Sequence, residues 1–146
     1  MNNKAERWIN VRGENGELIC DYGNEPAICA IDRVSQNNAC FRRALWTGKY
    51  LQTTLMTIPV GCDIGKEVHQ CTDQMIKIEQ GVAMVQFGDC SDSLKNVRRV
   101  NANYAIFIPA GTWHNIINCS NVPLKLFSVY APPQHPFGTL ENCKTD

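Results

Sequence analysis

The sequence predicts an all-β fold, a barrel or a sandwich, and three features of its pattern support this class. Glycine and proline divide the chain into short runs, within which β-branched and aromatic residues are frequent. Long stretches with the 3.6-residue apolar period of a helix are absent from the sequence. The length of 146 residues suits one domain, with a core large enough to fold unaided.

Turn-forming residues separate eight predicted strands. Gly48 divides the first pair, Gly61 follows the second strand, and Gly81 marks a hairpin. A sharp turn at Pro109 and Gly111 precedes the seventh strand. The predicted strands cover residues 44–50, 52–58, 66–70, 74–80, 83–87, 104–108, 113–118 and 124–130.

The segments outside these strands are less regular. Residues 25–32 are predicted as an edge strand, and residues 90–96 are polar and predicted as a surface loop. Prolines from Pro132 to Pro136 exclude a regular strand or helix, so the tail is expected to run over the surface or to cover part of the barrel. The predicted organisation is an N-terminal extension (1–25), a barrel (26–131) and a C-terminal tail (132–146).

The charge pattern argues against two classes of partner. Fourteen basic and 14 acidic side chains balance to a formal net charge of zero, which gives no reason to expect nucleic acid or an anionic membrane surface. No stretch approaches the roughly 20 apolar residues needed to span a bilayer. The first ten residues are polar and lack the apolar segment of a secretory signal, so we expect a cytoplasmic protein.

Eight cysteines are many for a chain of this length. No two of them have the C-x-x-C spacing of zinc knuckles and thioredoxin-like sites. Because we find no export signal, we predict reduced thiols that serve as small apolar residues. The cysteines stand at positions 20, 29, 40, 62, 71, 90, 119 and 143.

A group of potential metal ligands lies in the middle of the chain. Glu67 and His69 are two residues apart and would point to the same face of a strand. Gln74 follows after a polar turn, and His114 opens a later strand. A Glu-x-His pair also occurs by chance on solvated strands, but two of the three histidines in this chain are in the group. A carboxylate, an amide oxygen and two imidazoles suit zinc, iron, manganese or nickel.

The spacing of these residues resembles the paired signatures of the cupin family. The first signature, G-x5-H-x-H-x3,4-E-x6-G, is similar to Gly61-x5-Glu67-x-His69-x4-Gln74-x6-Gly81. The second, G-x5-P-x-G-x2-H-x3-N, is similar from its proline onward to Pro109-x-Gly111-x2-His114-x3-Asn118. Over about residues 26–146 the chain resembles small single-domain cupins (cupin 2 conserved barrels) that are labelled mannose-6-phosphate-isomerase-like. The resemblance implies an all-β double-stranded β-helix, a jelly-roll barrel, with the metal inside.

The resemblance also implies a ligand set. Glu67 stands at the first histidine of the signature, His69 and His114 match histidines, and Gln74 replaces the usual glutamate. We therefore expect one divalent metal on these four residues: zinc first, with iron, manganese and nickel as alternatives. Two other ligands remain open in place of Gln74, the carboxylate of Asp73 and the thiolate of Cys71. Asn103 replaces the glycine that opens the second signature, a change that we expect to affect only the turn.

By the same resemblance, the expected function is an aldose–ketose isomerase of the mannose-6-phosphate isomerase type that acts on a sugar or sugar phosphate. The metal would act as a Lewis acid, and a base would move a proton between two carbons. Four side chains are open as the base, Lys66, Asp73, Tyr130 and His135, and three as cations for a phosphate, Arg42, Arg43 and Lys66.

Two other function classes stay open: a non-haem iron cupin dioxygenase, and a non-catalytic metal-dependent binder of a sugar or another small molecule. In each case the partner is a small molecule in the mouth of the barrel, and a homodimer is left open as the assembly. The residues expected to contact the substrate are Trp46, Gln52, Thr54 and Lys66, with Phe107 and Trp113 on strands that face or flank the cavity.

Overall fold

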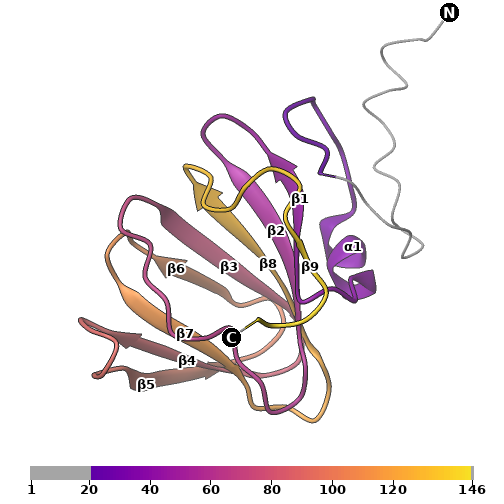
Figure 1. Cartoon of the computed structure of the whole chain (residues 1–146). Helices are drawn as coiled ribbons and strands as arrows, with labels where there is room; N and C mark the ends of the chain where they lie inside the picture. The colour runs from indigo at the N-terminus through magenta and orange to yellow at the C-terminus, as the bar shows by residue number, and fades with distance from the viewer. Residues whose placement is uncertain (1–20, 146) are drawn as a thin grey trace, which may run out of the picture.

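The structure is a computed structural model, and it describes residues 21–145. Within this range the chain forms nine strands and one short helix (Figure 1). In chain order the elements are α1 (Ile31–Asn37), β1 (Arg42–Thr47), β2 (Gln52–Ile58), β3 (Asp73–Gln80), β4 (Ala83–Gly88), β5 (Lys95–Val100), β6 (Ala105–Ile108), β7 (Trp113–Asn118), β8 (Leu124–Ala131) and β9 (Leu140–Glu141).

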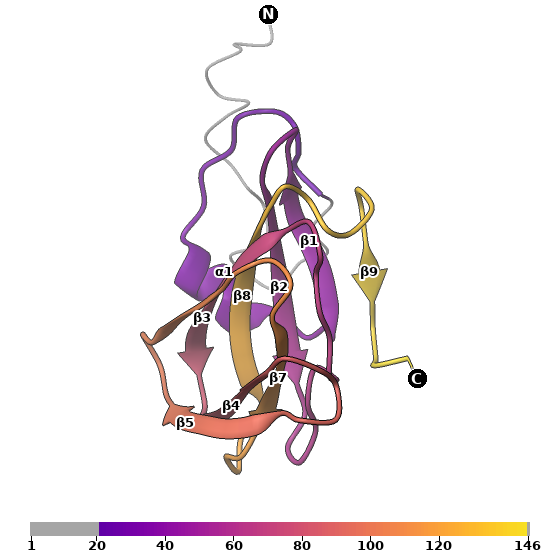
Figure 2. The same ribbon diagram turned by 90° about the vertical axis from the view of Figure 1, so that its left-hand side faces the viewer.

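Two antiparallel sheets form the walls of a barrel. The larger sheet has the order β6-β3-β8-β2-β1-β9, and the smaller has the order β5-β4-β7. Their inner faces enclose the main apolar core, which includes Ile58, Ile78, Ile116 and Leu124, each 0% exposed. In the view of Figure 2, α1 and β9 lie on opposite sides of this barrel. The all-β prediction is confirmed.

The inner face of the larger sheet changes from apolar to polar along its strands. In β8 the residues at every second position are Leu124, Leu126, Ser128 and Tyr130, and all four are 0% exposed. The inner faces of the neighbouring strands β2 and β3 become polar at the same level, because Gln52 of β2 and Gln74 of β3 both pair with Tyr130. One end of the barrel is therefore filled by aliphatic side chains, and the other end is lined by hydrogen-bonding groups.

The outer face of the larger sheet has a second, smaller core under helix α1. Val34 of the helix packs with Leu45, Leu55 and Phe127 of the sheet. The edge strand predicted over residues 25–32 is wrong, because the chain there is irregular up to residue 30 and then helical. The helix directs Val34 and Ser35 inward, and both are buried.

Three further predictions about local structure need correction. Residues 66–70 form no strand: Glu67 makes one isolated bridge, after glycines with positive φ at positions 61 and 65. β5 begins at Lys95, inside the predicted loop, and its largely exposed polar residues gave no apolar alternation to detect. The predicted tail includes β9, because the chain is free of proline after Pro136 and pairs with the edge of β1.

The remaining organisational predictions have mixed outcomes. Residues 1–20, most of the predicted extension, and Cys20 lie outside the described residues, and the domain boundaries stay predictions. Cys40, Cys62, Cys71, Cys90, Cys119 and Cys143 have free thiols, but five of these six are exposed and so do not act as core residues. Among residues 21–145, no helix has the length and apolar composition that crossing a membrane would require.

Candidate metal centre

Two segments that are distant in sequence bring Glu67, His69 and His114 together. Residues 62–67 run beside β7, with isolated bridges at Asp63–Ile117 and Glu67–His114. Glu67 and His114 exchange two backbone hydrogen bonds, with N–O distances of 3.0 and 2.9 Å. The amide of Gly111, in the turn before β7, donates to the carbonyl of His69 at 2.8 Å. These bonds hold the two signature segments in a defined register.

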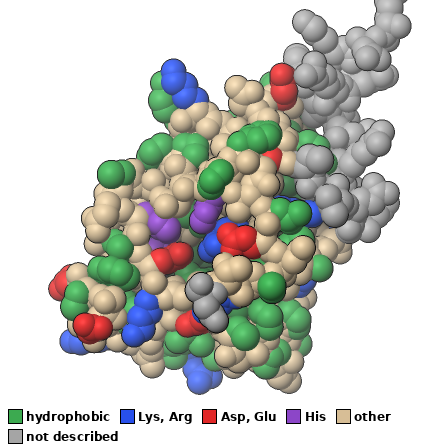
Figure 3. Space-filling model, in the orientation of Figure 1, with side chains coloured by type: hydrophobic (Ala, Val, Ile, Leu, Met, Phe, Trp, Pro, Cys, Tyr) green, Lys and Arg blue, Asp and Glu red, His purple; other side chains and the backbone are tan. Residues whose placement is uncertain are grey.

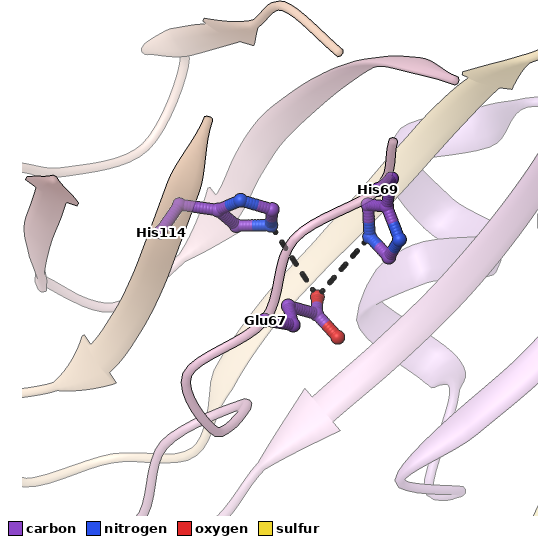
Figure 4. A group of neighbouring side chains, drawn as sticks. All are labelled: Glu67, His69 and His114. Carbon is purple, nitrogen blue, oxygen red and sulfur yellow. Dashed lines mark ion pairs between the residues drawn. The ribbon is translucent and has the colours of Figure 1, made fainter. Parts of the chain in front are cut away.

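The carboxylate of Glu67 lies between the two imidazole rings (Figure 4). Its Oε1 is 3.6 Å from Nε2 of His69 and 3.5 Å from Nε2 of His114. One ligand atom from each residue can be chosen so that all three lie within 4.8 Å of one another. Two atoms that each bind a tetrahedral zinc ion at about 2.1 Å lie about 3.4 Å apart, so the carboxylate–imidazole spacings fit a shared ion.

Four buried polar atoms of the predicted ligands make no hydrogen bond within the described part of the chain. They are both ring nitrogens of His69, Nε2 of His114 and Oε1 of Gln74. The other ring nitrogen of His114, Nδ1, is 2.9 Å from the carbonyl oxygen of Thr112, an arrangement that leaves Nε2 to act as a ligand. Buried polar atoms are seldom left unpaired, because each costs about 1–3 kcal/mol. A bound metal ion would pair with one nitrogen of each imidazole and with the amide oxygen of Gln74.

The electrostatics favour an ionised Glu67. Burial by itself would raise the pKa of this carboxyl group, but the imidazoles of His114 and His69 outweigh burial and lower the pKa to about 2. The Glu67 side chain is 23% exposed, whereas the side chains of His69 and His114 are 6% and 0% exposed. The centre is thus buried on its histidine side and reached by solvent at the carboxylate. On the face of the molecule drawn in Figure 3, histidine side chains lie near the middle, beside acidic and basic side chains.

Gln74 differs in placement from the two alternatives to it. Its side chain is buried on the inner face of β3, and its Nε2 donates to Oγ of Ser128 at 3.2 Å. Asp73 is exposed, and its Oδ1 accepts a hydrogen bond from the amide of Ala110 at 2.8 Å. Cys71 is also exposed. Of the three, Gln74 alone has its side chain inside the barrel, with an oxygen left unpaired.

Beyond the three clustered residues, Tyr130 and His135 extend the site toward the tail. The ring of His69 is 5.6 Å from that of Tyr130, which is 5.2 Å from that of His135, both in edge-to-face arrangements. Nε2 of His135 lies 3.3 Å from the hydroxyl oxygen of Tyr130. Burial, with a further contribution from the charge of Glu67, raises the pKa of Tyr130 to about 12, so its hydroxyl keeps its proton at neutral pH.

Of the residues predicted to contact substrate, two lie at the polar end of the barrel and two do not. Gln52 and Thr54 are 0% exposed on the inner face of β2. Trp46 pairs with Thr53 after a β-bulge and lines a groove of about 410 Å³ on the outer face of the sheet, together with Leu45. Lys66 is exposed to solvent. The structure therefore does not bring Trp46 and Lys66 to the inner wall.

The two flanking aromatic residues also lie away from the inner wall. Phe107 is 74% exposed, and its neighbours Ile106 and Ile108 are the buried residues of β6. Trp113 precedes the buried His114 in β7 and so points to the other face of its sheet.

Sequence reasoning missed two partners at the site. Ser128 supports Gln74, and the signal for it was the period-2 alternation of the predicted strand at residues 124–130. Glu141 accepts hydrogen bonds from Nη1 of Arg42 at 3.1 and 3.3 Å. Nothing in the sequence connects these two residues, because they are 99 positions apart and meet only when β9 pairs with β1.

Comparison with known proteins identifies a family and agrees with this fold. Residues 54–130 match the family model described as a cupin domain. The chain is 51% identical to the uncharacterized protein YrkC of Bacillus subtilis (strain 168), over 98% of this chain and 78% of YrkC. The crystal structure of BH2720 from Bacillus halodurans superposes with a TM-score of 0.83, at 51% identity over 85% of this chain and 94% of that one. A protein with a double-stranded β-helix domain from Klebsiella pneumoniae subsp. pneumoniae superposes with a TM-score of 0.60, at 18% identity over 80% of this chain and 98% of that one, which supports the fold alone.

Proposed function

The chain belongs to the cupin domain family, and we propose that it is a metal-dependent aldose–ketose isomerase of the mannose-6-phosphate isomerase type. Its substrate is a sugar or sugar phosphate that enters the polar end of the barrel. The metal, for which zinc is the first choice, is held by Glu67, His69, Gln74 and His114.

One observation carries the metal assignment. Three of these residues present buried donor atoms without a hydrogen-bond partner in the described chain, and the carboxylate of the fourth lies between two of them. Water or another side chain is the usual partner of such atoms. A carboxylate, an amide oxygen and two imidazoles match the ligand preferences of zinc and of other borderline divalent ions.

The charge of the ligand set favours Lewis-acid chemistry. Glu67 is the one anionic member, so a divalent ion would keep a net charge of about +1 together with its ligands. Such an ion supplies polarisation of the carbonyl and hydroxyl oxygens of a sugar. The chain itself provides the buried hydroxyl of Tyr130, which stays protonated, and the apolar core that fills the other end of the barrel.

A second candidate rests on a different observation. Glu67, His69 and His114 alone make a two-histidine, one-carboxylate set, which is the ligand set of many non-haem iron oxygenases. This set supports a cupin dioxygenase if Gln74 is not a ligand. The third class, a binder without catalysis, would use the same residues.

Metal analysis and a sugar assay test the proposal together. Protein purified without added metal should contain close to one zinc ion per chain, and NMR should detect interconversion of mannose 6-phosphate and fructose 6-phosphate. His114→Ala should lose both properties. Asp73→Asn, a matched change beside Gln74 that preserves the acceptor oxygen for Ala110, should keep both. Iron in place of zinc, without sugar turnover, would favour the oxygenase.

A further inference from the structure

His135 stands at the outer end of a line of aromatic rings that begins at the metal centre. The ring centroids are 5.4 Å apart from His114 to His69, then 5.6 Å to Tyr130 and 5.2 Å to His135. His135 is partly exposed, whereas Tyr130 is 0% exposed. A molecule entering the polar end of the barrel would therefore meet the imidazole of His135 before it reaches the buried rings.

The backbone of His135 is held from inside the barrel by Gln52. The Oε1 of Gln52 accepts hydrogen bonds from the amides of His135 and Gln134 at 2.9 and 3.2 Å. Its Nε2 donates to the carbonyl of His135 at 2.9 Å and to Oγ1 of Thr47 at 3.0 Å. All four hydrogen-bonding positions of the fully buried Gln52 amide are thus used, three of them on the tail, and they hold the backbone that carries the His135 imidazole.

The surroundings keep the His135 imidazole unprotonated at neutral pH. Burial is the largest effect and lowers its pKa to about 4, and the positive charge of Arg42 acts in the same direction. His69 also lowers the pKa, whereas the carboxylates of Glu67 and Glu141 oppose the shift. An unprotonated imidazole can accept a proton, which is the first requirement for a general base.

The other three candidate bases are less well placed. Lys66 is exposed to solvent, and Asp73 lies outside the barrel, bonded to the amide of Ala110. Tyr130 is fully buried, and its pKa, raised to about 12 by burial, keeps its hydroxyl protonated, so it is not a base at neutral pH.

We propose that His135 is the base that moves the proton between C1 and C2 of the sugar, with its position set by Gln52. This assignment rests on the isomerase function proposed above. The ring nitrogen of His135 that carries no proton accepts the C2 proton, the electrons of the broken C2–H bond form a C1–C2 double bond, and the carbonyl electron pair moves to O1. His135 then delivers a proton to C1, either the one that it accepted or one exchanged from solvent. The O2 hydroxyl proton transfers to O1 and the O2 electron pair forms the C2 carbonyl, which gives the ketose and restores His135. Nothing is oxidised, reduced or consumed.

Chemical modification can test the placement without relying on activity. Diethyl pyrocarbonate acylates unprotonated imidazoles, and the whole chain has three histidines, of which the metal should protect two. Metal-loaded protein should therefore gain one adduct by mass spectrometry, on His135. Fructose 6-phosphate at a concentration that saturates binding by calorimetry should slow this reaction at least about tenfold. Acylation at an unchanged rate in the presence of bound sugar phosphate would overturn the inference.

His135→Gln tests the chemistry, because glutamine can replace the hydrogen bond to Tyr130 but is not a base. The variant should keep one metal per chain and a KM within about threefold of the wild type, while kcat falls at least about 100-fold. Exchange of the C2 hydrogen of mannose 6-phosphate with D2O should fall equally. Exchange in both proteins at similar rates would overturn the assignment of His135 alone. If metal-loaded wild type neither interconverts mannose 6-phosphate and fructose 6-phosphate nor exchanges the C2 hydrogen, the isomerase proposal is overturned and, with it, this inference.

Discussion

Removal of the metal should lower the thermal stability of this protein by an amount that follows from the buried ligand atoms. One nitrogen of His69, Nε2 of His114 and Oε1 of Gln74 would lose their partner, and no other hydrogen-bond partner for them exists within residues 21–145. Each unpaired buried group costs about 1–3 kcal/mol. The carboxylate of Glu67, at 3.5–3.6 Å from both histidines, offsets part of this, so we expect a loss near the lower end, about 4 kcal/mol.

The linkage between ligand binding and folding gives a similar value for the lost free energy of unfolding. A ligand present at 1,000 times its dissociation constant stabilises the native state by about 4.1 kcal/mol. For a chain of about this length, 1 kcal/mol changes Tm by about 2–4 °C. Calorimetry on the zinc-loaded protein and on protein stripped with a chelator should therefore show melting temperatures that differ by about 8–16 °C.

Two variants are the controls for this measurement. His114→Ala should show little dependence of Tm on zinc, whereas Asp73→Asn should show the full wild-type difference. If stripping removes the metal by elemental analysis but leaves the wild-type Tm unchanged, the orphaned atoms are not metal ligands and the reasoning is refuted.

Four further predictions concern single groups. His114→Ala should lose most of the bound metal, and full metal content by elemental analysis would contradict the ligand assignment. Gln74→Glu should bind metal more tightly but lose isomerase activity, whereas Gln74→Ala should have weaker metal binding and lower activity. Competition with a chelator measures the metal affinity. If neither substitution changes this affinity, Gln74 is not a ligand and Asp73 and Cys71 become the candidates. In metal-free protein, His135 has a depressed pKa, so the unfolded chain takes up a proton near pH 6.5 but the native chain takes it up only at about pH 4. The contribution of the neutral imidazole to stability is therefore present above pH 6.5 and is lost as the pH falls toward 4. The free energy of unfolding in urea should thus differ less between pH 7 and pH 5 in His135→Gln than in the wild type. Thiol titration without reductant, on denatured protein taken from a cytosolic preparation, should find nearly all eight cysteines reduced, and four or fewer would contradict this prediction.

Much of the barrel could be predicted from sequence because its strands carry local signals. Residues 52–58 and 124–130 alternate between inward and outward side chains, and the predicted limits agree closely with β2 and β8. Asn103, at the position of a signature glycine, adopts a φ of +74°, a conformation that asparagine accepts more readily than most residues. The failures fall where local signals are weak: β5 is polar and exposed, and β9 has only two residues.

The candidate ligands were visible in sequence because metal binding requires particular residue types, and two of only three histidines matched the cupin spacing. The sequence could not show that residues 66–70 leave the strand conformation and still bring Glu67 and His69 toward His114, because this depends on the bridge to β7. It offered four candidate bases of equal standing. Gln52 and His135 are 83 residues apart, and the hydrogen bonds between them form only when the tail crosses the end of the barrel. The residue types and the spacing of the candidate metal site are thus determined locally, whereas the surroundings that distinguish one histidine from the others are made by long-range packing.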